Sequence, residues 1–151
     1  MYIVTIVSGG QTGADRAALD WAIARGLQHG GWCPAGRLAE DGLIPERYQL
    51  KELHDGGYRK RTLWNVRDSD ATLIISLAPE LTGGSAATMR FARSLKKPWL
   101  HVSPGMDWQV AVQSWLRDIA PGVLNIAGPR ASSAPGIEAF TWQVLDGAFP
   151  K

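Results

Sequence analysis

The sequence predicts an α/β fold: a doubly wound, mainly parallel sheet of about five strands, Rossmann-like in type, with helices on both faces. Short apolar runs rich in β-branched residues alternate with amphipathic segments of helical period. Gly-containing turns separate the two kinds of segment. The length of 151 residues suits one domain, and no repeat or linker interrupts it. We therefore expect residues 1–151 to form a single domain.

The first half of the chain opens with a strand, a Gly-rich turn and a helix. Residues 2–7 predict a strand that ends at the turn Ser8–Gly10. A helix is expected over residues 12–25, because its apolar residues recur at helical spacing and Gly26 follows it. A short second strand is expected over residues 30–33.

Residues 34–57 are predicted to be an irregular segment, because Pro and Gly residues interrupt every longer pattern. A loop of this length inside a compact domain is usually functional or marks a wrong assignment, and we favour the first interpretation. A helix is then expected over residues 58–67, followed by a strand over residues 71–77. That strand is apolar enough to be central and buried.

The second half repeats the alternation. A second Gly pair precedes a helix over residues 85–96, and a strand follows at 98–102. A helix is expected over 107–119, with Asp107 as a suitable N-cap. The segment 123–130 predicts the fifth strand and a turn, and residues 134–148 predict the last helix.

Composition excludes several classes of protein. With 45% hydrophobic and 20% charged residues the chain is expected to be globular, and no apolar run approaches the roughly 20 residues of a membrane span. The start, "MYIVTIVSGG", lacks the basic region and cleavage site of a signal peptide. We expect a cytoplasmic protein that does not bind membranes. The single cysteine and three scattered histidines predict no protein-ligated metal.

The basic residues indicate the chemistry of a ligand. Eleven of the sixteen are Arg, whose planar guanidinium suits phosphate and other oxyanions. The sequence has neither a Lys-rich run nor the mixture of aromatic and basic residues typical of single-strand binding. An anionic small molecule is therefore favoured over nucleic acid.

Three Gly-containing turns are expected at the carboxyl edge of the sheet, where such folds bind ligands. They are residues 8–13, 82–85 and 128–132, and each precedes a helical pattern. Glycine allows close approach of a phosphate, and a helix start offers free N–H groups. The alternative is that each is only a tight structural turn. Three at one edge favour a polyanion site.

Further candidates lie between these turns. Arg37 and Arg47 are expected to reach the ligand because each sits in a loop restricted by Pro and Gly, although exposed ion pairs explain many such charges. Asp15 is expected to cap helix 12–25 or to pair with Arg16, and a role in binding the ligand is the alternative. Trp32 and Trp64 could stack on a heterocycle.

The chain lacks the usual signatures of a nucleophile: no G-x-S-x-G, no Cys–His pair and no H-E-x-x-H. A general base could be any of four carboxylates, and nothing ranks one above the others. They are Asp15, Glu40, Asp41 and Glu46. We therefore predict no catalytic residue and a site that holds a ligand without turning it over.

Five segments together resemble the putative molybdenum carrier family, the molybdenum cofactor carrier proteins of the SLOG superfamily. They are "SGGQTGADRAALDWA", "GWCPAGRLAEDGLIPERYQLKE", "RTLWNVRDSDATLI", "LTGGSAATMRFA" and "GPRAS". They cover nearly the whole chain in the same order, and the long second segment is the most specific.

The resemblance implies a Rossmann-like fold assembled as a dimer or tetramer, and seven Trp in the chain make self-association credible. It also implies a carrier or storage protein for the molybdenum cofactor, a phosphate-bearing molybdopterin, or for molybdate or another oxyanion. Molybdenum enzymes would be the recipients. The residues that match the family's pocket are Gly9, Gly10, Thr12, Gly13, Thr82, Gly83, Gly84, Ser85, Gly128, Arg130 and Ser132.

The superfamily also contains lysine-decarboxylase-like proteins that act as cytokinin-activating phosphoribohydrolases. Their second loop reads P-G-G-x-G-T and is followed by a catalytic Glu. Here Met89, Arg90 and Phe91 stand where that acid is expected, which argues against the hydrolase chemistry. A nucleotide or nucleotide-sugar hydrolase remains the alternative function, and a module that senses a nucleotide is a further one.

Overall fold

A five-stranded parallel sheet forms the centre of the computed structural model, which describes residues 3–151. The strand order is β2-β1-β9-β7-β8. Its members are β1 (Thr5–Val7), β2 (His29–Gly30), β7 (Ala71–Ile75), β8 (Trp99–Val102) and β9 (Val123–Ala127). The predicted α/β fold with a five-stranded, mainly parallel sheet is confirmed.

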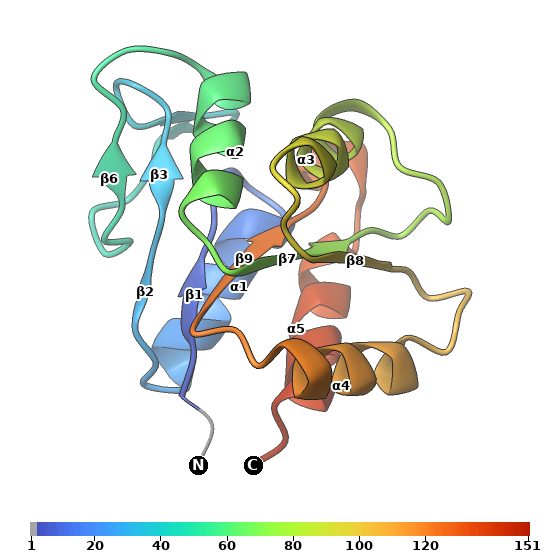
Figure 1. The fold of residues 1–151 in the computed structure, drawn as a ribbon. Coiled ribbons are helices and arrows are strands. Elements are labelled where there is room, and N and C mark those ends of the chain that lie inside the picture. Colours follow the sequence, from blue (N-terminus) through green and yellow to red (C-terminus); the bar gives the residue numbers. More distant parts are fainter. Residues whose placement is uncertain (1–2) are drawn as a thin grey trace.

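Helices cover both faces of this sheet, as Figure 1 shows. One face carries α1 (Ala14–Ala24), α4 (Trp108–Ile119) and α5 (Ile137–Ala148), and the other carries α2 (Tyr58–Arg67) and α3 (Gly83–Ser94). Within residues 3–151, no helix has both the length and the apolar character that crossing a bilayer would require.

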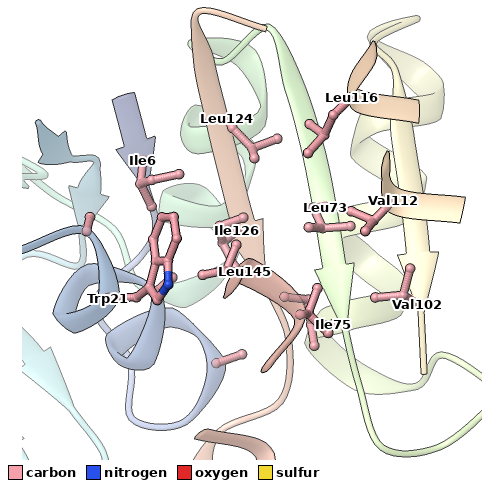
Figure 2. Close-up of a cluster of buried hydrophobic side chains, with 14 of the residues drawn as sticks. Ile6, Trp21, Leu73, Ile75, Val102, Val112, Leu116, Leu124, Ile126 and Leu145 are labelled. Atoms are coloured by element: carbon pink, nitrogen blue, oxygen red, sulfur yellow. The ribbon is translucent and has the colours of Figure 1, made fainter. Parts of the chain in front are cut away.

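The main hydrophobic core lies between the sheet and the face formed by α1, α4 and α5 (Figure 2). All five residues of β7 are buried, as expected for a central strand. Trp21 of α1 is fully buried in this core, and its indole N–H donates to the Asp146 carboxylate at 2.9 Å. That bond ties α1 to α5 at the edge of the apolar cluster.

Most predicted elements are observed with ends shifted by a few residues. The first strand is Thr5–Val7, and Tyr2 lies outside the described residues. Helix α3 starts at Gly83, two residues earlier than predicted, so the Gly pair belongs to the helix. Asp107 is the N-cap residue of α4 as expected, but its side chain makes no capping hydrogen bond in the described structure.

The segment after β2 differs from the prediction. Gly31, with φ of +120°, bends the chain, and a Cβ there would lie 2.2 Å from the Ser8 carbonyl oxygen. The predicted strand 30–33 is therefore divided: β2 stays in the main sheet, while β3 (Trp32–Cys33) pairs with β6 (Lys51–Glu52).

The segment 34–57 is also more ordered than an irregular loop. It contains a hairpin of β4 (Leu38–Ala39) and β5 (Gly42–Leu43), which are antiparallel. A second, small core packs this segment against α1, and it comprises Leu19, Cys33, Ala39, Ile44 and Tyr48. Strands of two residues carry no periodicity that a sequence pattern can reveal.

The central strand provides a test of the core. Leu73 is completely buried, so Leu73→Ala removes its apolar contacts and leaves a cavity. We expect the free energy of unfolding in urea to fall by about 3 kcal/mol. The matched control is Leu43, which is 73% exposed on the hairpin. Leu43→Ala should change the free energy of unfolding by less than about 0.5 kcal/mol. Equal losses in the two variants would contradict the assigned core.

Candidate functional site

The three Gly-containing turns follow strands β1, β9 and β7, which are neighbours in the sheet. Because the strands are parallel, their carboxyl ends meet at one edge, and the turns lie side by side there. We name them turn 1 (residues 8–13), turn 2 (residues 82–85) and turn 3 (residues 128–132). The sequence order of β1, β7 and β9 conceals this adjacency.

A cavity of about 550 Å³ lies at this edge, bordered by α2, α3 and all three turns. Its volume is within the range of small-molecule sites. The lining comprises Gly9, Gln11, Asp15, Tyr58, Arg59, Arg61, Thr62, Asn65, Thr82, Gly83, Gly84, Ser85, Ala87, Thr88, Arg90, Asn125, Ile126, Ala127, Gly128, Pro129, Arg130 and Ser133.

The structure brings part of the predicted site to this cavity. All of turn 2 lines it, together with Gly9 of turn 1 and with Gly128 and Arg130 of turn 3. The remaining predicted residues are outside the lining: Gly10, Thr12, Gly13, Arg37, Arg47 and Ser132.

The glycines of turn 2 differ from those of the other turns. A Cβ on Gly83 or Gly84 would meet nothing within 4 Å, so these two leave open space beside the cavity. By contrast, a Cβ on Gly13 would lie 2.4 Å from the Pro129 carbonyl oxygen, and one on Gly128 would lie 2.2 Å from that of Ile75. Gly10 similarly meets Leu50. Contacts within the protein thus explain the glycines at 10, 13 and 128.

Arg37 and Arg47 hold the segment 34–57 in place. The Arg37 guanidinium donates to the carbonyl oxygens of Ile44, Pro45 and Tyr48. Arg47 donates to the Tyr48 hydroxyl and lies 3.5 Å from an Asp20 carboxylate oxygen. Burial, followed by the neighbouring Asp20, raises the pKa of Tyr48 to about 12, so the phenol stays protonated and donates to Asp20.

A buried ion pair, Asp15 with Arg61, lies in the cavity wall. Arg61 Nη1 is 2.6 Å from Asp15 Oδ2, and the two side chains are 12% and 6% exposed. Burial raises the pKa of Asp15, and the Arg61 guanidinium opposes this rise. The expected pair of Asp15 with Arg16 is wrong, because Arg16 binds Asp41.

Gly9 is the residue that admits this pair. A Cβ at position 9 would lie 1.7 Å from Arg61 Nη1, so only glycine leaves room for the guanidinium. Arg61 Nε is buried and has no hydrogen-bond partner among the described residues. Sequence reasoning missed the pair because the two residues belong to different helices, α1 and α2. The one available signal was an acid beside a Gly-rich turn.

The lining is strongly cationic. Within residues 3–151, it contains four arginines, at positions 59, 61, 90 and 130, and one carboxylate, Asp15. The start of α3 adds the positive end of a helix dipole at turn 2. Such a surface favours an anion carrying several oxygen atoms.

Thr12 and Ser132 are joined beside the cavity by a carboxylate that the protein itself supplies. Both Ser132 donors reach Glu40: the N–H reaches Oε2 at 3.2 Å, and the hydroxyl reaches Oε1 at 2.5 Å. The Thr12 hydroxyl also donates to Glu40, and Arg130 Nε lies 3.8 Å from it. The hydrogen bonds from Ser132 and Thr12 lower the pKa of Glu40.

Trp32 and Trp64 pack against each other edge to face, with ring centroids 4.8 Å apart, and neither lines the cavity. The indole N–H of Trp32 donates to Asp68. Tyr58 is the aromatic side chain found in the described part of the lining. The described residues include no group of three His, Cys, Asp or Glu side chains placed to hold a metal ion.

Comparison with known proteins identifies a family and a similar solved structure. The circularly permutated YpsA SLOG family matches residues 6–149. The crystal structure of a protein named "putative molybdenum carrier protein", from Syntrophus aciditrophicus SB, is 50% identical, with a TM-score of 0.93 over 98% of this chain and 96% of that one. No curated protein matches significantly.

A second solved structure, that of (E)-4-hydroxy-3-methyl-but-2-enyl diphosphate reductase, is 10% identical. It aligns with a TM-score of 0.39 over 93% of this chain and 59% of that one. This likeness is too low to support an inference about fold or function.

The contrast between the glycines can be tested by substitution. Gly128→Ala places a methyl group against the backbone of β7, so we expect the free energy of unfolding to fall by about 3 kcal/mol. Gly84→Ala faces open space in the first turn of α3 and should be neutral or stabilising by less than about 1 kcal/mol. Urea denaturation measures both, and a Gly84→Ala loss as large as that of Gly128→Ala would contradict the assignment.

The buried ion pair predicts a larger effect than the exposed ones. Asp15→Asn leaves the Arg61 charge buried without its partner, so we expect a loss of about 3 kcal/mol in the free energy of unfolding. Asp41→Asn breaks a pair whose acid is 48% exposed and should cost less than about 1 kcal/mol. In the double variant Asp15→Asn, Arg61→Met, stability should partly recover, and a further additive loss would show that the pair is not coupled.

Proposed function

The chain belongs to the circularly permutated YpsA SLOG family, and from that premise and the geometry of the cavity we propose that it is a non-catalytic carrier. Its cargo is a phosphate-bearing molybdenum cofactor or a related oxyanion. The observation that carries the proposal is the charge of the cavity: four arginines against one carboxylate among the described lining residues.

The donors suit that cargo. Turn 2 presents the start of α3 and the Ser85 hydroxyl to the cavity, while Gly83 and Gly84 leave space for a phosphate to approach the backbone. Arg61 Nε provides a buried donor without a partner in the described structure. The phosphate would bind at turn 2 and the remainder of the ligand would extend towards Tyr58 and α2. Molybdenum would enter as part of the cargo, bound to its own ligand.

The name of the Syntrophus protein, a putative molybdenum carrier, agrees with this cargo. Half of the residues are identical between the two chains, and the alignment includes nearly all of both. Delivery to a molybdenum enzyme and assembly of the chain into a dimer or tetramer are parts of the same proposal.

The arrangement of the carboxylate favours storage over turnover. Asp15 is held by Arg61 and by backbone N–H groups of Gly9 and Gln11, which oppose the rise in its pKa that burial causes. Because its oxygens already accept these hydrogen bonds, they are less available to take a proton from a substrate. In α3, Met89, Arg90 and Phe91 provide no acid, and Phe91 instead lies beneath the Arg59 guanidinium.

One observation favours a second function, hydrolysis of a nucleotide. Asp15 lies in the cavity wall and burial raises its pKa, a combination that is common at catalytic sites. Incubation with AMP followed by chromatography tests this: release of adenine by the wild type, lost in Asp15→Asn, would establish the hydrolase. Intact AMP after prolonged incubation would remove it.

The carrier proposal predicts a specific loss of cargo. Gly84→Leu fills the open space at turn 2, so protein purified without oxygen from a cofactor-producing host should retain at least tenfold less molybdenum and pterin than the wild type. Metal analysis and the fluorescence of the oxidised pterin measure both.

The matched control is Gly105→Leu, in a turn outside the cavity lining. A Cβ at Gly105 also meets nothing within 4 Å. That variant should retain the cargo of the wild type. Wild-type protein that carries neither molybdenum nor pterin, and does not slow oxidation of added cofactor, would refute the proposal.

A further inference from the structure

The donors around Glu40 form a compact cradle beside the cavity. Its members are the Thr12 hydroxyl, the N–H and hydroxyl of Ser132, and the Arg130 guanidinium. We name this set the Glu40 cradle. It joins turn 1 to turn 3, and Arg130 belongs both to the cradle and to the cavity lining.

The chemistry of this cradle is that of an oxyanion site. Two hydroxyls and one backbone N–H donate to the two oxygens of a single carboxylate. The Arg130 guanidinium, whose Nε–H donates to Ser133, adds its positive charge 3.8 Å from one of these oxygens. Donors of these kinds bind phosphate and other tetrahedral oxyanions in proteins. Each donor hydrogen can serve one acceptor at a time, so an external oxyanion and the Glu40 carboxylate cannot occupy the cradle together.

Glu40 lies in the turn of a short, exposed hairpin. It lies with Asp41 in the two-residue turn of the β4–β5 hairpin, and only two pairs of residues are in register in that hairpin. Leu38 and Leu43, which pair across it, are 52% and 73% exposed. The turn itself is tied down by the Arg16–Asp41 ion pair and by a hydrogen bond from the Glu40 N–H to Gln11. Displacement therefore needs only rotation of the Glu40 side chain, which leaves these contacts in place.

We infer that Glu40 is an internal competitor for the ligand: its carboxylate fills an oxyanion subsite made by Thr12, Arg130 and Ser132, and a tetrahedral oxyanion binds there by displacing it. The inference rests on the proposed function and deepens it, because it gives the carrier a built-in device for release. An oxyanion group held in the cradle, separate from the phosphate at turn 2, leaves when the Glu40 carboxylate rotates back.

The neighbouring Asp41 provides a matched control. It lies in the same turn, but its carboxylate binds Arg16, which is outside the cradle. Removing either carboxylate changes the charge of the hairpin equally. Only removal of Glu40 vacates the cradle, so any difference between the two variants reports on competition for these donors.

The test is calorimetric titration of wild type, Glu40→Ala, Glu40→Gln and Asp41→Asn with sodium molybdate, inorganic phosphate and AMP. We expect Glu40→Ala to bind at least tenfold more tightly than the wild type, Glu40→Gln to be intermediate, and Asp41→Asn to remain within twofold of the wild type. Adding Ser132→Ala to Glu40→Ala should abolish the gain. A gain for the inorganic anions identifies a free oxyanion as the occupant, and a gain confined to AMP identifies the phosphate of an organic ligand.

Equal affinities in wild type and both Glu40 variants, or an equal gain in Asp41→Asn, would overturn the inference. In the first case Glu40 is only a structural link between the turns. The isosteric Glu40→Gln keeps the test valid if the alanine variant does not fold. Failure of the carrier proposal is recognised separately: protein without molybdenum or pterin refutes the cargo, while the response of the Glu40 variants to inorganic oxyanions is still measured.

Discussion

The ion pair between Asp15 and Arg61 is the interaction on which the site depends. It joins α2 to the first turn of α1, beside Gly9, where a Cβ would overlap the Arg61 guanidinium. Because both groups are nearly out of water, their separation would leave a charge without solvent or partner. Together with the two hydrogen bonds between the Asn65 side chain and the Trp32 backbone, the pair positions α2 and with it one wall of the cavity.

Strand order supplies the other walls. Because β9 lies between β1 and β7, turn 3 lies between turn 1 and the start of α3. The close approaches of Gly13 to Pro129 and of Gly128 to Ile75 show how tightly this edge is packed. Turn 1 and turn 3 are packed closely against each other, whereas turn 2 leaves open space. This difference in packing explains why Gly13 and Gly128 differ in role from Gly83 and Gly84.

The segment 34–57, which contains the β4–β5 hairpin, packs beside turn 1 and α1. Arg37 organises its carbonyl groups, and Tyr48 reaches α1 through Asp20. The β4–β5 hairpin carries two carboxylates: Asp41 pairs with Arg16, and Glu40 accepts hydrogen bonds from the donors of the Glu40 cradle. Glu40 thus lies beside the cationic cavity, 3.8 Å from Arg130 of its lining, without being part of that lining.

The sequence by itself determined the alternation of strands and helices, the burial of β7 and the meeting of three turns at one edge. These depend on periodicity, turn residues and composition, which act between neighbours in the chain. Only the tertiary structure decided that Arg61 enters the cavity while Arg37 binds carbonyl groups, that Gly84 faces space while Gly128 faces backbone, and that Glu40 meets Ser132. The physical reason is that the destination of a side chain depends on segments that the fold brings together, and no periodic pattern in the sequence encodes those contacts.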